Sequence, residues 1–119
     1  MTAREVEFVP ATRELVIAFY GVPPVWTLKG HAALLGDRVI GIGGISYEGS
    51  TAVLFSDASP EMRARRRDMV RAFRVLEDLL SAEKRRLVAI AKEATAPRLL
   101  QRLGFAATDR PGVMVRGQI

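Results

Sequence analysis

The chain has 119 residues, of which 49% are hydrophobic and 26% charged, a balance typical of one soluble globular domain. It has no cysteine and a single histidine, which excludes disulfides, cysteine nucleophiles and thiolate or histidine-rich metal sites. No apolar run is long enough to cross a membrane, and the N-terminus lacks the pattern of a secretion signal. We therefore expect a single cytoplasmic domain over residues 1–119.

The net charge is +5, and arginine supplies fifteen of the 18 basic residues. Six of these arginines fall between Arg63 and Arg74. Because arginine binds phosphate and carboxylate through two parallel hydrogen bonds, this segment is a candidate anion site. A solvated face in a chain from a GC-rich genome is the alternative, and the sequence leaves both open.

The first third of the chain predicts a strand followed by a helix. Residues 4–9 alternate towards their end, as an edge strand does. Thr12 can cap a helix that runs to about Tyr20, and Gly21 can end it.

The middle of the chain predicts a three-stranded antiparallel meander. Residues 25–35, 38–47 and 51–57 are the three strands, separated by turns at 36–37 and 48–50.

A long helix is expected next. Ser59 is a good N-cap, Pro60 suits the first helical position, and apolar residues then recur at helical spacing as far as Leu80. Residues 86–91 follow as a buried strand. Because the helix crosses between two strands, strand 51–57 and strand 86–91 should be parallel neighbours.

The last third predicts a short helix and a hairpin. The helix covers about residues 95–103 and is capped by Gly104, and strands 105–108 and 113–116 pair with each other. The element order predicts the α+β class, with a mixed, mostly antiparallel sheet and helices on both of its faces.

This order, together with the segment from Ala96 to Phe105, resembles the GNAT superfamily of N-acetyltransferases. The segment is similar to the family's last helix and its Leu-Gly-Phe exit, here Leu103-Gly104-Phe105. The resemblance covers about residues 25–116. It implies that acetyl-CoA binds where the sheet splays after Phe55, in a groove between strands 51–57 and 86–91.

The resemblance also implies a pyrophosphate site at the start of the long helix, where the family has Arg/Gln-x-x-Gly-x-Gly/Ala. The matching stretch begins with Arg63, but its two small positions hold Arg66 and Asp68. These side chains crowd the backbone, so if the cofactor binds here, its phosphates should depend on arginine side chains; a solvated arginine face is the alternative. The predicted cofactor-binding residues are Phe55, Ser56, Asp57, Arg63, Ala64, Arg65, Arg66, Arg67 and Asp68.

The family's usual catalytic acid is replaced. Members often have a tyrosine four residues before the exit glycine, where this chain has Leu100, and an asparagine where it has Glu93. Leucine cannot donate a proton. The candidates for a replacement acid or base are His31, Tyr47, Glu48 and Asp57, each of which can equally be a core, turn or capping residue.

Two functions remain open at this point. The first is an acyl-CoA-dependent N-acetyltransferase that acts on a small-molecule or protein amine. The second is a catalytically degenerate GNAT-fold module, for which a phage origin is one option, that binds a protein partner. No aromatic residue interleaves with the arginines and no nucleic-acid-binding motif is present, which argues against nucleic-acid recognition. No membrane partner is expected, and the oligomeric state is left open.

Overall fold

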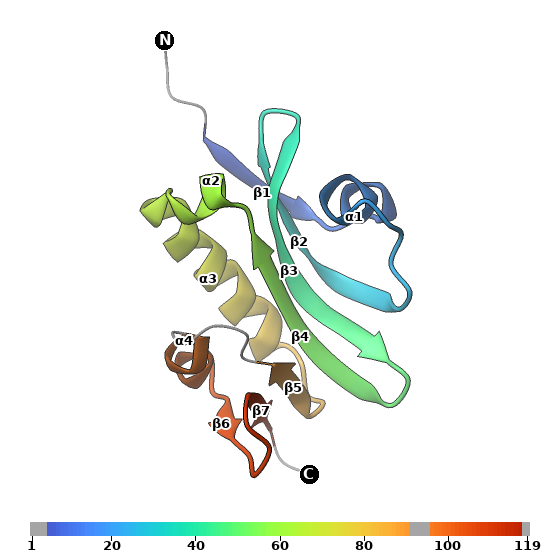
Figure 1. Cartoon of the computed structure of the whole chain (residues 1–119), viewed down its shortest axis with the longest axis vertical. Coiled ribbons are helices and arrows are strands. Elements are labelled where there is room, and N and C mark those ends of the chain that lie inside the picture. Colours follow the sequence, from blue (N-terminus) through green and yellow to red (C-terminus); the bar gives the residue numbers. More distant parts are fainter. Residues whose placement is uncertain (1–4, 91–95, 118–119) are drawn as a thin grey trace.

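A seven-stranded sheet in the order β1-β2-β3-β4-β5-β7-β6 forms the centre of the molecule (Figure 1). The computed structural model describes residues 5–90 and 96–117. Within them, β4 and β5 are parallel, and every other neighbouring pair is antiparallel. The predicted α+β fold with a mixed, mostly antiparallel sheet is confirmed.

The first part of the chain forms β1 (Val6–Pro10), α1 (Arg13–Tyr20) and β2 (Thr27–Leu35). Helix α1 begins where predicted, because the Thr12 hydroxyl accepts a hydrogen bond of 3.3 Å from the N–H of the helix's third residue. It ends at Gly21, which adopts a left-handed conformation with φ of 80°.

Strands β3 (Arg38–Glu48) and β4 (Thr51–Ala58) complete the predicted meander. Strands β2 and β3 approach each other very closely at the paired residues Gly30 and Gly44. A Cβ atom on Gly30 would lie 2.2 Å from the Gly43 carbonyl oxygen, and one on Gly44 would lie equally close to the backbone of β2. Only glycine fits this pair of positions.

The predicted long helix is interrupted, which corrects the expectation of one continuous helix from Pro60. Ser59 caps the N-terminus of helix α2 (Pro60–Arg63). Its hydroxyl accepts a hydrogen bond of 3.2 Å from the backbone N–H of Met62. Helix α3 (Arg66–Ser81) follows after a break at Arg65, whose φ of −100° and ψ of 82° lie outside the helical region. The Arg65 side chain instead hydrogen-bonds Asp68 in the first turn of α3.

The remaining elements are β5 (Leu87–Ile90), α4 (Ala96–Arg102), β6 (Ala106–Ala107) and β7 (Val113–Arg116). Because α3 connects β4 to β5, these two strands run in the same direction, as the sequence predicts. None of the described helices is long and apolar enough to span a membrane.

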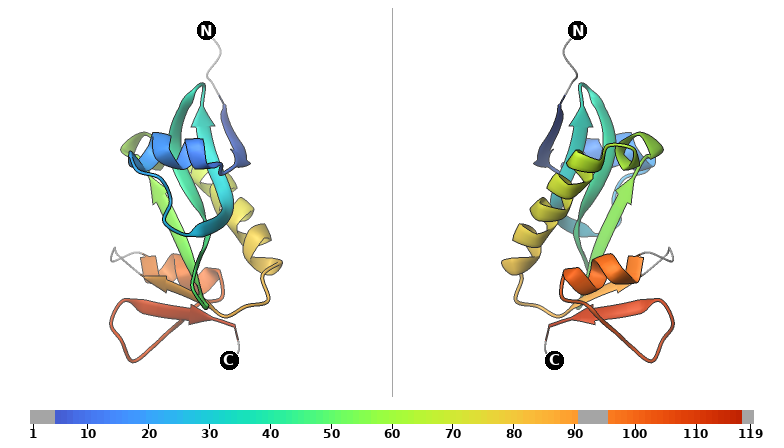
Figure 2. Two further views of the ribbon diagram at one scale, coloured as in Figure 1. Left: turned by 90° about the vertical axis from the view of Figure 1, so that its right-hand side faces the viewer. Right: turned by 90° about the vertical axis from the view of Figure 1, so that its left-hand side faces the viewer.

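The helices lie on both faces of the sheet, as predicted (Figures 1 and 2). On one face, Val16 of α1 packs against Ala32 and Ile42. On the other face, a larger core joins residues of α3 and α4 to the sheet, among them Leu80 and Leu87. Helix α1 packs against β2, β3 and β4, and no described helix packs on the corresponding face of β5.

We predict opposite effects of two glycine-to-alanine substitutions in this sheet. A Cβ atom on Gly41 would lie 3.5 Å from its nearest neighbours, beside a cavity of about 60 Å³ under α3. Gly41→Ala should raise the free energy of unfolding by about 0.4–1 kcal/mol, because alanine loses less backbone entropy on folding. Gly30→Ala should lower it by about 1–3 kcal/mol, because the new methyl group overlaps the backbone of β3. Urea unfolding followed by circular dichroism measures both, and equal effects would contradict the packing described here.

Candidate functional site

The two parallel strands part shortly after they meet. The last pair between β4 and β5 joins Leu54 to Ala89, whereas β4 remains paired with β3 as far as Ala58. Ile90 pairs with β7 instead of β4. Within the described residues, the sheet therefore opens at Phe55, at the place that the sequence predicts. Backbone N–H and C=O groups exposed on the open side of β4 need other hydrogen-bond partners.

A tyrosine and an aspartate meet just beyond this opening. The Tyr20 hydroxyl at the end of α1 donates a hydrogen bond to the carboxylate of Asp57, which lies two residues beyond Phe55 on β4. Burial, and then this hydrogen bond, raise the pKa of the Tyr20 hydroxyl well above its usual range. The phenol carries its proton at neutral pH, as any tyrosine does, and donates it towards Asp57.

Asp57 is one of the four catalytic candidates from the sequence, but sequence reasoning missed Tyr20. The two residues are 37 positions apart. Their contact depends on how α1 docks on the sheet, and no sequence pattern reports that. The sequence offered one local signal for Tyr20: it lies in the last turn of a predicted helix, directly before the glycine that ends it.

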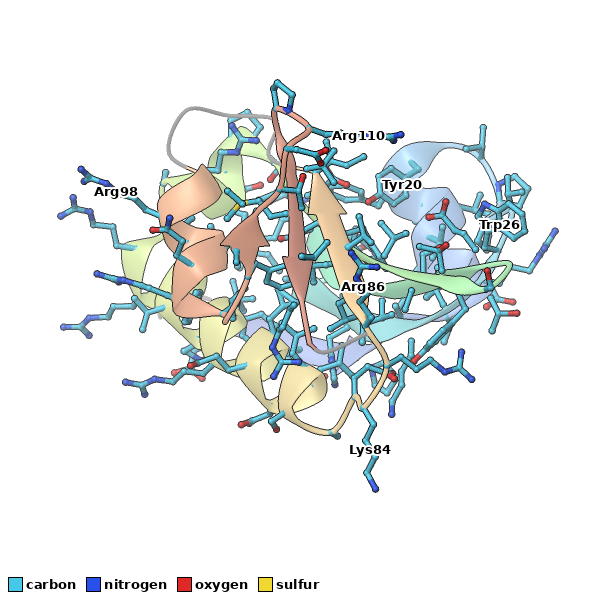
Figure 3. The ribbon with its side chains drawn as sticks, turned by 90° about the horizontal axis from the view of Figure 1, so that it is seen from below. Tyr20, Trp26, Lys84, Arg86, Arg98 and Arg110 are labelled. Carbon is cyan, nitrogen blue, oxygen red and sulfur yellow. The ribbon has the colours of Figure 1, made fainter. Side chains whose placement is uncertain are left out.

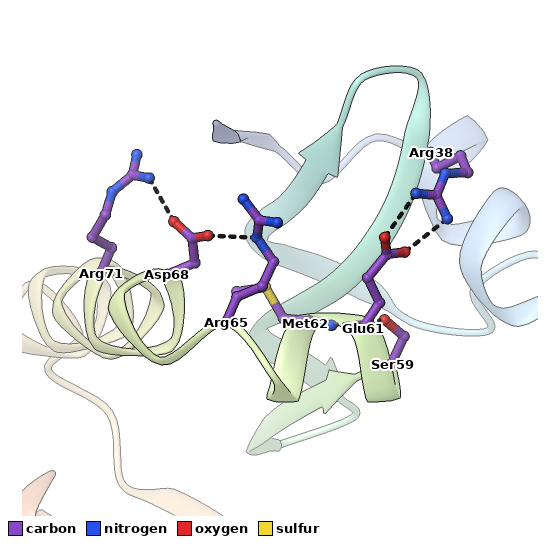
Figure 4. A network of polar contacts seen from close by, with 7 residues as sticks. All are labelled: Arg38, Ser59, Glu61, Met62, Arg65, Asp68 and Arg71. Carbon is purple, nitrogen blue, oxygen red and sulfur yellow. Dashed lines mark hydrogen bonds and ion pairs between the residues drawn. The ribbon is translucent and has the colours of Figure 1, made fainter. Parts of the chain in front are cut away.

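The segment from Arg63 to Asp68 covers the last residue of α2, two linking residues and the first turn of α3 (Figure 4). The Asp68 carboxylate accepts hydrogen bonds from Arg65 Nε at 2.7 Å and from Arg71 Nη1 at 3.0 Å. Asp68 lies in the first turn of α3, where the free backbone N–H groups also favour a negative charge. The protein's own carboxylate thus lies where the resemblance implies a pyrophosphate. Arg66 and Arg67, in the same turn, are exposed.

A second ion pair holds α2 beside the start of β3 (Figure 4). The Arg38 guanidinium donates two hydrogen bonds to the Glu61 carboxylate, at 2.7 and 2.9 Å. This contact lowers the pKa of Glu61 and raises that of Arg38. The bidentate geometry fixes the orientation of the short helix, although the pair itself is exposed to solvent.

Of the other three catalytic candidates, His31 lines the same cavity as Asp57, whereas Tyr47 and Glu48 lie at the far end of β3. His31 faces the cavity under α3, and its Nδ1 atom is buried with no hydrogen-bond partner among the described residues. Tyr47 and Glu48 lie at the hairpin end of β3, where the Tyr47 hydroxyl donates a hydrogen bond of 2.8 Å to Glu83. Tyr47 pairs with Ala52, five residues from Asp57, which corresponds to roughly 17 Å along a strand.

The remaining predicted site residues have different environments. Phe55 packs into the core beneath α1, and Ser56 lines the cavity under α3. Ala64 caps the C-terminus of α2. Leu100 on α4 is 9% exposed and packs in the core beside α3, so this position supplies no proton donor. Glu93 lies outside the described residues.

Comparison with known proteins identifies the fold. No family model and no curated protein matches the chain. The structure is similar to the ribosomal-protein-S18-alanine N-acetyltransferase from Escherichia coli, with a TM-score of 0.63 and 14% identity over 97% of this chain and 96% of that chain.

Two further solved structures agree with this similarity. A putative acetyltransferase of the GNAT family from Desulfovibrio desulfuricans has a TM-score of 0.56 and 17% identity, covering 93% of this chain and 95% of that chain. The AtaT Y144F mutant toxin, bound to the C-terminus of the antitoxin AtaR and acetyl-CoA, has a TM-score of 0.55 and 10% identity over 93% of this chain and 92% of that chain. The chain therefore has a GNAT-like fold, which confirms the resemblance at the level of the fold.

The two tyrosines of the chain should ionise at a higher pH than free tyrosine does. Burial and a hydrogen bond to a carboxylate raise the pKa of both Tyr20 and Tyr47. Because an unfolded chain releases these protons near pH 10, their contribution to stability is present below about pH 10 and is lost as the pH rises towards the folded-state pKa. Near-ultraviolet absorbance of tyrosinate measures the titration. Tyr20→Phe should leave only the Tyr47 step, and a Tyr20 step at the pH of free tyrosine would show that neither the burial of its hydroxyl nor the hydrogen bond to Asp57 is present.

Proposed function

We propose that the chain binds acetyl-CoA in the opening between β4 and β5 and transfers the acetyl group to a primary amine. The observation that carries this proposal is the hydrogen-bonded pair of Tyr20 and Asp57 at the point where the two strands part. The GNAT-like fold supports the same location, because the resemblance implies a thioester bound in this splay.

The pair can move the two protons that the reaction requires. An acceptor amine arrives as an ammonium ion, and the Asp57 carboxylate accepts one of its protons. The amine nitrogen then attacks the thioester carbonyl carbon, the new C–N bond forms, and the C–S bond breaks. Tyr20 donates its hydroxyl proton to the departing thiolate and receives the proton held by Asp57, and the freed Asp57 carboxylate then accepts the second proton from the amide nitrogen and releases it to water. This relay supplies an acid that Leu100 cannot provide.

The start of α3 is the place where we expect the phosphate groups. Arg66 and Arg67 are exposed in its first turn, and Asp68 already holds Arg65 and Arg71 close to the helix N-terminus. Arginine side chains can bind phosphate through paired, charged hydrogen bonds without a glycine at the backbone.

Asp57→Asn tests the proposed proton transfer. Loss of the base should lower kcat/KM by about 10²–10⁴-fold, with a smaller loss for Tyr20→Phe, because a positioned acid or base contributes a factor of this size. Thiol release from acetyl-CoA measures the rate across a panel of amines. Glu48→Gln is the matched control, since this carboxylate lies at the far end of β3. Asp57→Asn with wild-type turnover would exclude the relay.

Substitutions at the start of α3 test the phosphate site. The Arg66→Ala, Arg67→Ala double variant should bind acetyl-CoA more weakly, by about 1.5–3 kcal/mol for each charged hydrogen bond removed. Asp68→Ala should bind it more tightly, because a competing negative charge is gone. Calorimetry measures both affinities, with the exposed Arg13→Ala variant of α1 as the control for loss of a positive charge elsewhere on the surface. Unchanged affinity in both test variants would mean that the phosphates bind elsewhere.

A second candidate function is favoured by two observations. Leu100 is part of the hydrophobic core, and the Asp68 carboxylate lies at the helix start where a phosphate would bind. Both features fit a GNAT-fold protein that serves as a non-catalytic binding module. A folded wild-type protein that neither binds acetyl-CoA nor releases thiol with any amine would support this alternative.

A further inference from the structure

The cavity of about 60 Å³ under α3 has no part in the proposed proton transfer. Its lining is apolar or glycine, apart from His31, Ser56 and Asp57. The Asp57 carboxylate is already paired with the Tyr20 hydroxyl of α1, which lies on the opposite face of the sheet from α3 (Figures 1 and 3). His31 and Ser56 are therefore the polar side chains that remain available to a molecule in this cavity.

These two residues lie in one row across the sheet. His31 of β2 pairs with Gly43 of β3, and Gly43 pairs with Ser56 of β4. Directly paired residues point to the same face of a sheet, so His31 and Ser56 flank a position that has no side chain. Neighbouring strands lie about 4.8 Å apart, which places the outer two Cα atoms roughly 10 Å from each other. A Cβ atom on Gly43 would lie 3.5 Å from Leu76 Cδ1 of α3, so a side chain there would take up part of the cavity.

The row is open to solvent at its Ser56 end. Ser56 is exposed, whereas the other lining residues are buried or half-buried. It also lies beyond the last pair between β4 and β5, which joins Leu54 to Ala89. A molecule can therefore enter the cavity from the same opening that the sheet leaves beyond Phe55.

The other end of the row has a polar atom without a partner. His31 Nδ1 is buried and has no hydrogen-bond partner among the described residues. Such an atom has lost its hydrogen bonds to water without replacing them, which is unfavourable. An imidazole nitrogen donates or accepts according to its tautomer, so an amide or a hydroxyl group can satisfy it in either state.

We propose that this cavity binds a short aliphatic chain of three or four carbon atoms with a hydrogen-bonding group that contacts His31. The cavity is larger than the roughly 30 Å³ that one water molecule occupies in the liquid, and smaller than the roughly 150 Å³ that admits benzene. The apolar lining, which includes Met69 and Leu76 of α3, favours an aliphatic chain. Such a chain comes either from a free small amide or alcohol, or from the acyl group of a thioester bound at the β4–β5 opening.

Butyramide tests the cavity without any CoA thioester. We expect saturable shifts of the Gly43 amide and of the His31 imidazole in nuclear magnetic resonance spectra of the ¹⁵N-labelled protein. Acetamide, which lacks two methylene groups, should bind about tenfold more weakly, because each buried methylene group contributes to affinity. Hexanamide should also bind more weakly, because its chain exceeds the cavity.

Three variants locate the binding. Ala72→Leu enlarges a lining residue of α3 and should abolish the butyramide shifts, whereas Val70→Leu enlarges an exposed residue of the same helix and should leave them unchanged. His31→Phe keeps a ring at the end of the row but removes Nδ1, and should weaken butyramide by about five- to tenfold. Circular dichroism checks the fold of each variant, and His31→Phe with the chain-length series decides the matter if Ala72→Leu does not fold.

Calorimetry with three thioesters distinguishes the two sources of the chain. If an acyl group fills the cavity, 4-hydroxybutyryl-CoA should bind the wild type at least about tenfold more tightly than acetyl-CoA does, with butyryl-CoA between them. This preference should disappear in Ala72→Leu. If the ligand is a free molecule, the three thioesters should bind alike while butyramide still shifts Gly43.

Two results would overturn the inference. The first is a protein in which neither butyramide nor the acyl chain length has any effect, as a cavity occupied only by water would give. The second is a butyramide response that Ala72→Leu and His31→Phe leave intact. Butyramide binding without acetyl transfer would count against the proposed function alone. Acetyl transfer without butyramide binding or chain-length preference would count against this inference alone.

Discussion

The candidate site depends on the limited pairing between β4 and β5. The two strands share three residue pairs, from Ala52–Leu87 to Leu54–Ala89, and then take different partners. Up to that point, the core beneath α3 holds both strands, because Leu54 and Leu87 are buried in the same cluster. Beyond it, β5 follows β7 and β4 follows β3. Had the parallel pairing continued, another strand would occupy the space beside Asp57, and no substrate could reach the carboxylate.

The position of α1 determines what faces this opening. Helix α1 packs on the sheet through Val16, opposite the small side chain of Ala32 and beside Ile42. Because Ala32 is small, the helix can lie close to the strands, and its last turn reaches as far as β4. The Tyr20 hydroxyl then contacts Asp57, and partial burial together with this hydrogen bond raises the pKa of the phenol. The proposed proton relay therefore depends on how α1 packs against the sheet.

Local signals in the sequence predict most of the fold. Gly21 ends α1, and Ser59 and Pro60 start α2, because capping and fixed φ angles act within one helical turn. The break at Arg65 could not be predicted this way, since alanine and arginine both favour helices. The contact of Tyr20 with Asp57 was equally hidden, because it depends on the docking of a helix on a distant strand. The sequence placed Asp57 beside the splay but could not separate it from His31, which lies on β2 and lines the cavity under α3.

At the arginine-rich start of α3, an internal carboxylate holds two of the arginines while others are exposed to solvent. Asp68 is largely buried, with a side chain that is 13% exposed, and it accepts hydrogen bonds from arginines on both sides of it in the sequence. A carboxylate in this first turn interacts favourably with the partial positive charge of the helix N-terminus, as a bound anion would. It also holds Arg65 and Arg71 in fixed orientations before any ligand arrives. An incoming phosphate would have to compete with Asp68 for these donors, so the same carboxylate that organises the site also limits how tightly it can bind an anion.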